Sequence, residues 1–136
     1  MGDAIFELLS RAKTIAVVGL SDNPLRPSYG VSAYMQAQGY KIVPVNPRIG
    51  EALGEKCYAS LLDLPSDLVK QVGLVDVFRR SEYVDEIVEQ AIALKIPAIW
   101  MQEGVINERA GEKARQAGMF VVMDRCILKE HRARVG

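Results

Sequence analysis

The chain has few of the side chains from which disulfide frameworks and metal centres are built. It contains two cysteines, Cys57 and Cys126, which stand far apart, and one histidine, His131. A metal centre needs a cluster of such ligands, so we expect no bound metal. The N-terminus also carries no signal-peptide pattern, and together with the scarcity of cysteine this indicates a reducing, cytoplasmic compartment.

Net charge and long apolar runs are also missing. The 17 Lys and Arg residues balance 17 Asp and Glu residues, whereas nucleic-acid-binding proteins usually carry a basic excess. No apolar run reaches the roughly 18 residues of a membrane-spanning helix. At 136 residues the chain has about the length of one domain. We therefore expect residues 1–136 to form a single domain with neither a nucleic-acid nor a membrane partner. A protein partner and a homodimer stay open.

Apolar runs and helical stripes alternate along the chain. The runs predict strands over residues 14–19, 40–45, 71–78, 98–101 and 119–123. Apolar residues at helical spacing predict helices over the first dozen residues, 29–38, 81–94 with Ser81 as N-cap, 107–116, and within 124–134. Between Asn46 and Leu64 the pattern fits either a short strand or a turn.

Strands that alternate with helices are typical of βαβ units. The sequence therefore predicts an α/β fold: a doubly wound, mostly parallel, five-stranded Rossmann-like sheet with helices on both faces. Pro44 has no N–H to donate, which favours an edge position for the second strand. The strand order 2-1-3-4-5 meets this condition and puts the switch point between the first and third strands.

Three polar turns carry arginine directly after predicted strands. They are residues 17–28 with Arg26, 43–48 with Arg48, and 74–80 with Arg79 and Arg80. In an open α/β sheet, ligands bind beyond the carboxyl ends of the strands, so these turns converge on one crevice. A guanidinium group donates two parallel hydrogen bonds to phosphate and stays charged. We therefore expect an anionic ligand that carries several phosphates.

The first turn lacks most of the dinucleotide fingerprint. That motif has three closely spaced glycines and an acidic residue after the second strand, but here Gly19 stands alone and Asn46-Pro47-Arg48 follows the second strand. A redox enzyme or sensor that binds a nicotinamide nucleotide thus becomes the alternative. Gly19 admits a phosphate close to the backbone, and the hydroxyls of Ser21 and Ser28 can bind it. The structural alternative is that Gly19 only forms a tight turn and Ser28 only caps a helix.

Taken together, the turns resemble the small CoA-binding protein family, whose single domain is similar to the CoA-binding domain of the succinyl-CoA synthetase α subunit. The resemblance covers about the whole chain in order. The matching segments are 15–19, 26–28, 43–47, 75–79, 100–104 and 124–126. It implies a Rossmann-like fold that binds coenzyme A or an acyl-CoA as a non-catalytic carrier or sensor module.

The resemblance also implies a placement of the ligand. Gly19, Ser21, Arg26 and Ser28 would hold the diphosphate, and Asn46, Pro47 and Arg48 would lie along the adenosine and its 3′-phosphate. Phe78, Arg79 and Arg80 would line the other side, and Gln102 and Gly104 would lie nearer the pantetheine. The synthetase uses a phosphohistidine in a second domain, and we expect no counterpart of that domain within residues 1–136. We therefore assign no catalytic residue.

Cys126 is the one residue with a candidate covalent role. It stands beside Arg125 and five residues before His131, which suits a thiolate, but a small buried side chain is the favoured explanation. If the pantetheine reaches Cys126, disulfide exchange with the CoA thiol follows as a hypothesis. Asp76 and Glu103, near strand ends, fit either acid–base roles or the orientation of turns.

Overall fold

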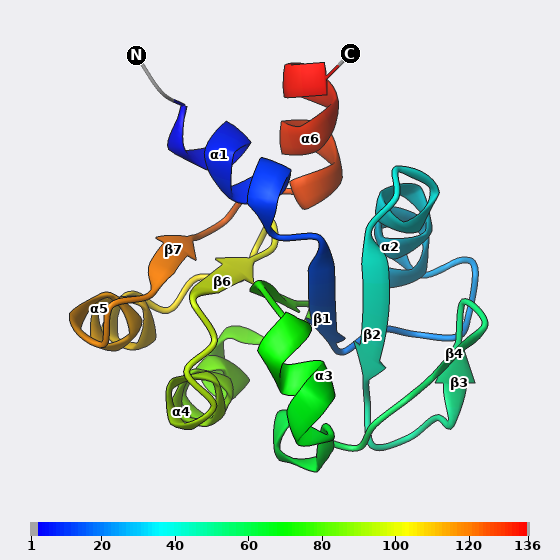
Figure 1. Cartoon of the computed structure of the whole chain (residues 1–136), viewed down its shortest axis with the longest axis horizontal. Helices are drawn as coiled ribbons and strands as arrows, with labels where there is room; N and C mark the ends of the chain where they lie inside the picture. Colours follow the sequence, from blue (N-terminus) through cyan, green and yellow to red (C-terminus); the bar gives the residue numbers. More distant parts are fainter. Residues whose placement is uncertain (1–2, 136) are drawn as a thin grey trace.

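Five short apolar segments pair side by side into one parallel sheet. The computed structural model describes residues 3–135, and in it the strand order is β2-β1-β5-β6-β7 (Figure 1). The strands are β1 (Thr14–Val18), β2 (Lys41–Val45), β5 (Leu74–Val77), β6 (Ala98–Met101) and β7 (Phe120–Val122). All four pairings are parallel. This confirms the predicted fold and order, with the Pro44 strand at the edge.

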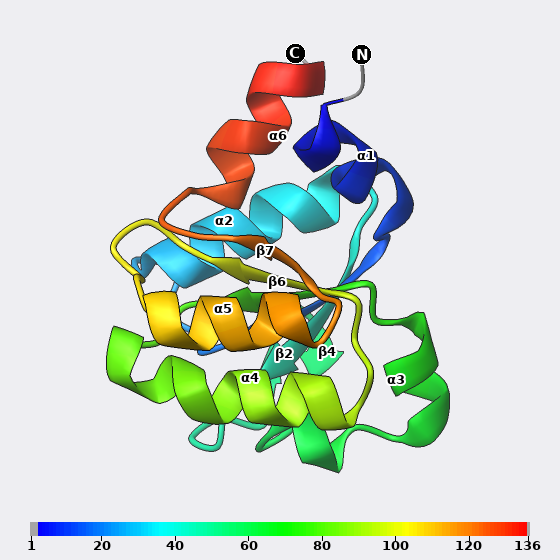
Figure 2. The same ribbon diagram turned by 90° about the vertical axis from the view of Figure 1, so that its left-hand side faces the viewer.

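Helices cover both faces of the sheet (Figure 2). On one face lie α1 (Ala4–Arg11), α2 (Pro27–Ala37) and α6 (Ile127–Val135), and on the other lie α3 (Ser66–Gln71), α4 (Val84–Ala93) and α5 (Glu108–Gln116). Successive strand residues alternate between the two cores: Ile99 packs under α4 and α5, whereas Trp100 packs under α1 and α6. Because both faces are covered, the strands are apolar almost throughout.

The segment after β2 is a β-hairpin that the sequence pattern left undecided. Strand β3 (Glu51–Ala52) pairs antiparallel with β4 (Glu55–Lys56). The two turn residues, Leu53 and Gly54, both have positive φ angles, of 55° and 77°, as a type I′ hairpin turn requires. The chain then returns to the sheet, where Tyr58 N–H donates to the Pro44 carbonyl (3.0 Å).

Two local predictions were wrong. The segment predicted as a strand from residue 71 begins only at Leu74, because Gln71 ends α3, a six-residue helix too short to show a helical stripe. Ser81 does not cap α4. It begins the 3₁₀ turn η2 (Ser81–Tyr83), which follows the earlier turn η1 (Leu61–Asp63) in the chain. The Ser81 hydroxyl instead accepts from Ile106 N–H (3.0 Å), which ties the β5 and β6 turns together.

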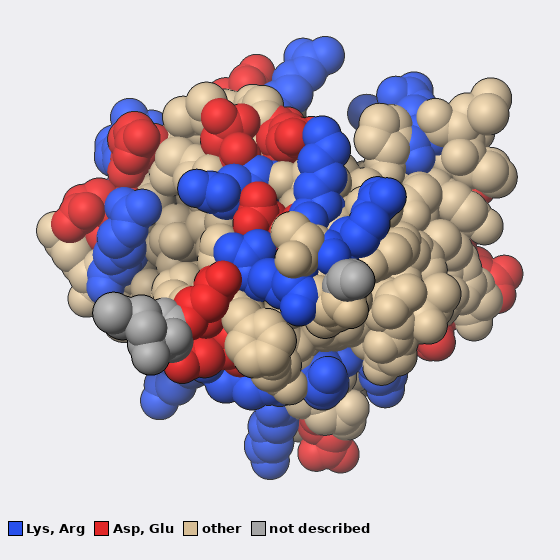
Figure 3. Space-filling view, turned by 90° about the horizontal axis from the view of Figure 1, so that it is seen from above, with Lys and Arg blue, Asp and Glu red and all other residues tan. Residues whose placement is uncertain are grey.

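The two ends of the described chain meet beside α1 and α6. Asp3 caps α1 by accepting from the N–H groups of Ile5 and Phe6, and its carboxylate also pairs with Arg134 of α6 (2.9 Å). Figure 3 shows this side of the molecule, where Lys and Arg side chains intermingle with Asp and Glu. Among residues 3–135, no helix combines the length and apolar character that crossing a bilayer demands.

Gly30, within α2, and Gly39, just after α2, allow a matched test of how backbone conformation affects stability. Gly39 follows the helix with φ +99°, whereas Gly30 lies within it, and a Cβ at either position meets no described neighbour within 4 Å. We expect Gly39→Ala to lower the free energy of unfolding by about 1 kcal/mol. Gly30→Ala should raise it by about 0.5–1 kcal/mol. Urea denaturation measures both, and shifts of the same sign would contradict this account.

Candidate functional site

Gly19 allows the first and third of the Arg-bearing turns to lie against one another. Its φ is +93°, and its N–H donates to the Val45 carbonyl (2.8 Å). A Cβ at Gly19 would lie 3.0 Å from the carbonyl carbon of Phe78 and 3.1 Å from Arg79 Cδ. The structure therefore gives Gly19 a packing reason of its own: the β1 and β5 turns approach too closely there for any other residue.

Beyond this contact lies a cavity of about 360 Å³, which we call the polar cavity. Its lining residues are Gly19, Ser21, Arg26, Pro27, Ser28, Asn46 and Phe78. Helix α2 opens onto it with Arg26 as N-cap and Pro27 as its first residue, and no side chain caps this end. The first N–H groups of a helix and its dipole favour an anion.

The serines and Asn46 of the polar cavity hold its wall in shape. Ser28 lies inside the first turn of α2 and does not cap it, which excludes the structural alternative for this residue; its hydroxyl accepts from Ser21 N–H (3.0 Å). Asn46 donates to the Leu20 carbonyl (3.0 Å) and accepts from Arg48 N–H (2.9 Å). These bonds join the turns after β1 and β2 into one wall.

Two further cavities lie beyond the carboxyl ends of the strands, the border of the sheet that we call the carboxyl edge. The first, about 470 Å³ and here called the long cavity, is lined by Pro27, Val31, Phe78, Arg79, Arg80, Gln102, Glu103, Gly104, Val105 and Cys126. The second, about 250 Å³ and here called the α4 cavity, includes Pro47, Arg79 and Tyr83. Phe78 borders the polar and long cavities while also packing on the core under α2. The structure thus brings together every predicted site residue except Arg48, which is exposed and lines none of the three.

The arginines of this edge carry charge that no acidic side chain neutralises. Within residues 3–135, none of the ion pairs involves Arg26, Arg48, Arg79 or Arg80. The Arg79 guanidinium lies over the Tyr83 ring, 4.3 Å from its centroid. Glu103 is the one acidic residue that lines the long cavity, and it pairs with Lys129 (3.1 Å). Glu86 lines the α4 cavity, although no ion pair joins it to Arg79. The polar and long cavities therefore carry unpaired positive charge in a protein of zero net charge.

Beneath the long cavity lies a buried carboxyl group whose role the sequence left open. Asp76 is 2% exposed, and burial raises its pKa to about 7. Gln102 donates to Asp76 (2.6 Å) and accepts from Ile127 N–H (3.4 Å), so the pair links β5 to the start of α6. Asp76 thus orients Gln102, which fits the alternative that it positions turns.

Cys126 and His131 do not act together. Cys126 is buried at the wall of the long cavity, whereas His131 bonds through Nδ1 to the Tyr34 hydroxyl (2.9 Å) and lines a separate cavity at the opposite sheet edge. His131 is therefore not the base for a Cys126 thiolate.

Cys57 lies elsewhere, and burial raises the pKa of its thiol. Among residues 3–135, no three His, Cys, Asp or Glu side chains are grouped to hold a metal ion.

The sheet order and its crevice define the class: a doubly wound Rossmann-like domain with its cavities at the carboxyl edge. Residues 13–132 match the family model described as a CoA binding domain. The chain is 45% identical over 127 residues to the protein YneT of Bacillus subtilis, covering 93% of this chain and 91% of that one. A solved structure from Pyrococcus horikoshii is 40% identical with a TM-score of 0.92, covering 98% of this chain and 91% of that chain.

A longer relative carries a similar segment. The chain is 32% identical over 129 residues to an ADP-forming acetate–CoA ligase of Methanocaldococcus jannaschii, covering 92% of this chain and 18% of the ligase. It therefore spans less than a fifth of that enzyme. This chain belongs to the CoA-binding domain family, as the resemblance of its turns predicted.

The buried Asp76 carboxyl predicts a pH-dependent stability. Its folded pKa of about 7 exceeds the ordinary value of 3.8, so between about pH 4 and pH 7 the folded state keeps a proton that the unfolded chain releases. The free energy of unfolding should therefore fall as pH rises through this window, by up to about 4 kcal/mol, and level off above it. Asp76→Asn should lack this component. Urea denaturation from pH 4 to pH 8 tests the difference, and identical pH profiles for both proteins would contradict it.

Proposed function

We propose that this protein binds coenzyme A or an acyl-CoA across the carboxyl edge of its sheet and acts as a non-catalytic carrier or sensor module formed by one domain. The observation that carries the proposal is the group of arginines without carboxylate partners around the start of α2. Coenzyme A carries a diphosphate and a 3′-phosphate, which supply the missing negative charge. Membership in the CoA-binding domain family supports the same ligand.

In this proposal the diphosphate lies in the polar cavity. The start of α2 supplies backbone donors there. The Ser28 hydroxyl already accepts from Ser21 and keeps its own hydrogen for a phosphate oxygen. Arg26 reaches the same space from the rim. A charge-assisted hydrogen bond of this kind contributes about 1.5–3 kcal/mol.

The placement of the pantetheine arm and of the adenosine follows from the residues that line the long cavity and the α4 cavity. The long cavity has apolar walls at Val31, Phe78 and Val105 and suits the pantetheine arm, which would end beside Gln102, Gly104 and Cys126. The adenosine would lie along Pro47, with Arg79 of the same cavity and the exposed Arg48 near the 3′-phosphate. The Asn46-Pro47-Arg48 turn offers no carboxylate for an unmodified ribose, which disfavours NAD.

Thermal unfolding tests the ligand and its contacts. A ligand at about 100 times its Kd stabilises the fold by roughly 2.7 kcal/mol, so saturating CoA should raise the Tm by several degrees. Arg26→Ala and Arg79→Ala should each weaken CoA binding about 10-fold to 100-fold. Arg132→Ala is the matched control, because Arg132 is exposed on α6 and lines none of the three cavities. Equal losses in all three variants would contradict the site.

The same assay separates competing ligands. Dephospho-CoA should stabilise the protein less than CoA, and equal shifts would exclude a 3′-phosphate contact. Larger shifts with NAD(H) or NADP(H) than with CoA would favour the nicotinamide-nucleotide alternative. A protein stabilised by none of these nucleotides would overturn the proposal.

The position of the thiol end can be tested by chemical trapping. Incubation with CoA disulfide should let the Cys126 thiolate attack one sulfur, which forms a Cys126–CoA mixed disulfide and releases one CoA thiol. Intact-protein mass spectrometry should show one CoA adduct in the wild type and in Cys57→Ser, and none in Cys126→Ser. An adduct that persists in Cys126→Ser would place the thiol end elsewhere.

A further inference from the structure

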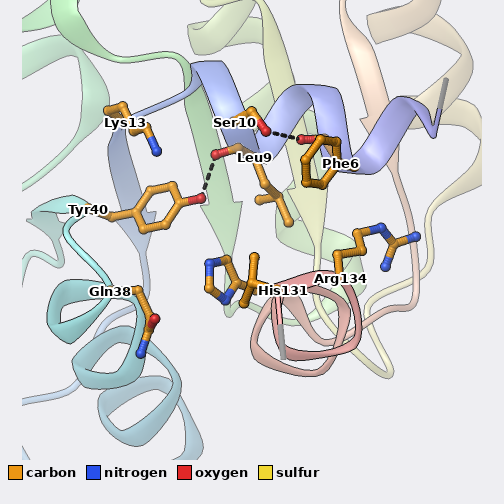
Figure 4. A pocket seen from close by; sticks show the side chains of 9 residues that line it. Phe6, Leu9, Ser10, Lys13, Gln38, Tyr40, His131 and Arg134 are labelled. Atoms are coloured by element: carbon orange, nitrogen blue, oxygen red, sulfur yellow. Dashed lines mark hydrogen bonds between the residues drawn. The ribbon is translucent and has the colours of Figure 1, made fainter.

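A separate cavity of about 270 Å³, here called the tail cavity, opens at the opposite edge of the sheet (Figure 4). It is lined by Phe6, Leu9, Ser10, Lys13, Gln38, Tyr40, His131, Arg134 and Val135. Lys13 and Tyr40 directly precede β1 and β2, at the amino ends of the strands. The five residues of β1 span about 16 Å, so a ligand bound at the carboxyl edge does not account for this cavity.

One side of the tail cavity carries a positive charge without a counter-charge. Lys13 forms no ion pair among the described residues, and its Nζ lies 5.0 Å from the centroid of the Tyr40 ring. Arg134, by contrast, is neutralised by Asp3 (2.9 Å) and Glu130 (2.7 Å). Among residues 3–135, no acidic residue lines the cavity. It therefore has the charge to hold one anionic group.

Hydrogen-bond donors face the same space. His131 is 6% exposed, and its Nδ1 bonds to the Tyr34 hydroxyl, which has no other partner among residues 3–135. Burial and the charge of Lys13 lower the pKa of His131, which favours the neutral ring. With the Tyr34 proton on this bond, the ring hydrogen belongs on Nε2, which has no protein partner in the described chain. Gln38 is exposed, and Figure 4 shows its amide pointing away from His131.

The remaining walls are apolar or already satisfied. Phe6 and Val135 flank the cavity and are 46% and 56% exposed, so their apolar surfaces are open to a ligand. The hydroxyls of Ser10 and Tyr40 donate to the carbonyls of Phe6 and Leu9, drawn as dashed lines in Figure 4. A cavity of about 150 Å³ suffices for benzene. The tail cavity thus has room for a ring or a branched chain together with a polar head.

We propose that the tail cavity binds a small monocarboxylate with a compact aromatic or branched apolar body. The carboxylate lies between Lys13 Nζ and His131 Nε2, and the apolar body lies against Phe6, Leu9 and Val135. The site is independent of the carboxyl-edge cavities, so it stands or falls separately from the proposed binding of CoA.

Benzoate and its neutral isostere benzamide provide the test on the wild-type protein. In ¹H–¹⁵N NMR titrations, benzoate should shift the signals of Lys13, Tyr40 and His131 with a Kd on the order of 1 mM. It should leave those of Arg26 and Arg79 in place. Benzamide should bind at least about tenfold more weakly. Equal binding of both compounds, or shifts confined to the carboxyl edge, would overturn the proposal.

Substitution of the cation completes the experiment. Lys13→Met removes the charge and keeps the aliphatic stem, so benzoate affinity should fall about tenfold, whereas Lys13→Arg should retain it. Lys70→Met, on the exposed side of α3, is the matched control and should bind benzoate as the wild type does. The NMR spectra themselves report whether each variant is folded. Unchanged affinity in Lys13→Met would refute the site, while CoA titrated into the same samples reports separately on the carboxyl edge.

Discussion

The close approach of the β1 and β5 turns is the constraint on which the carboxyl edge depends. Gly19 lies against the backbone of Phe78 in a left-handed conformation, and no side chain fits between them. This contact occurs where the strand order reverses, which is where open α/β sheets form their crevice. Because the two turns meet there, Phe78 and Arg79 border the same space as the start of α2.

Polar residues of this edge divide into two kinds. Ser28, Asn46 and Gln102 form hydrogen bonds with neighbouring backbone or side-chain groups and so hold the walls of the polar and long cavities in place. Arg26, Arg79 and Arg80 have no carboxylate partner in the described chain and are available to a ligand. A rigid frame with unpaired cations binds polyanions at low reorganisation cost, whereas paired arginines would first have to break their own ion pairs.

The sequence predicted the sheet well because buried parallel strands are continuous apolar runs and Pro44 excludes a central position. It missed α3 and left the β3–β4 hairpin undecided, because elements of six and two residues carry too little periodicity to recognise. The role of Ser81 depended on a contact with Ile106, which lies far along the chain. Cys126 and His131 are close in sequence, but their side chains line different cavities. Residues from both ends of the described chain line the tail cavity, so no local sequence motif predicts it.

The ion pair between Asp3 and Arg134 holds the two ends of the fold side by side, away from the carboxyl edge. A unit whose ends meet on one surface can be joined to other domains without rerouting the chain across its crevice. The acetate–CoA ligase of Methanocaldococcus jannaschii, in which a segment like this one makes up less than a fifth of the length, illustrates such modular use. The ends of the described chain thus lie on a surface apart from the cavities in which a ligand is proposed to bind.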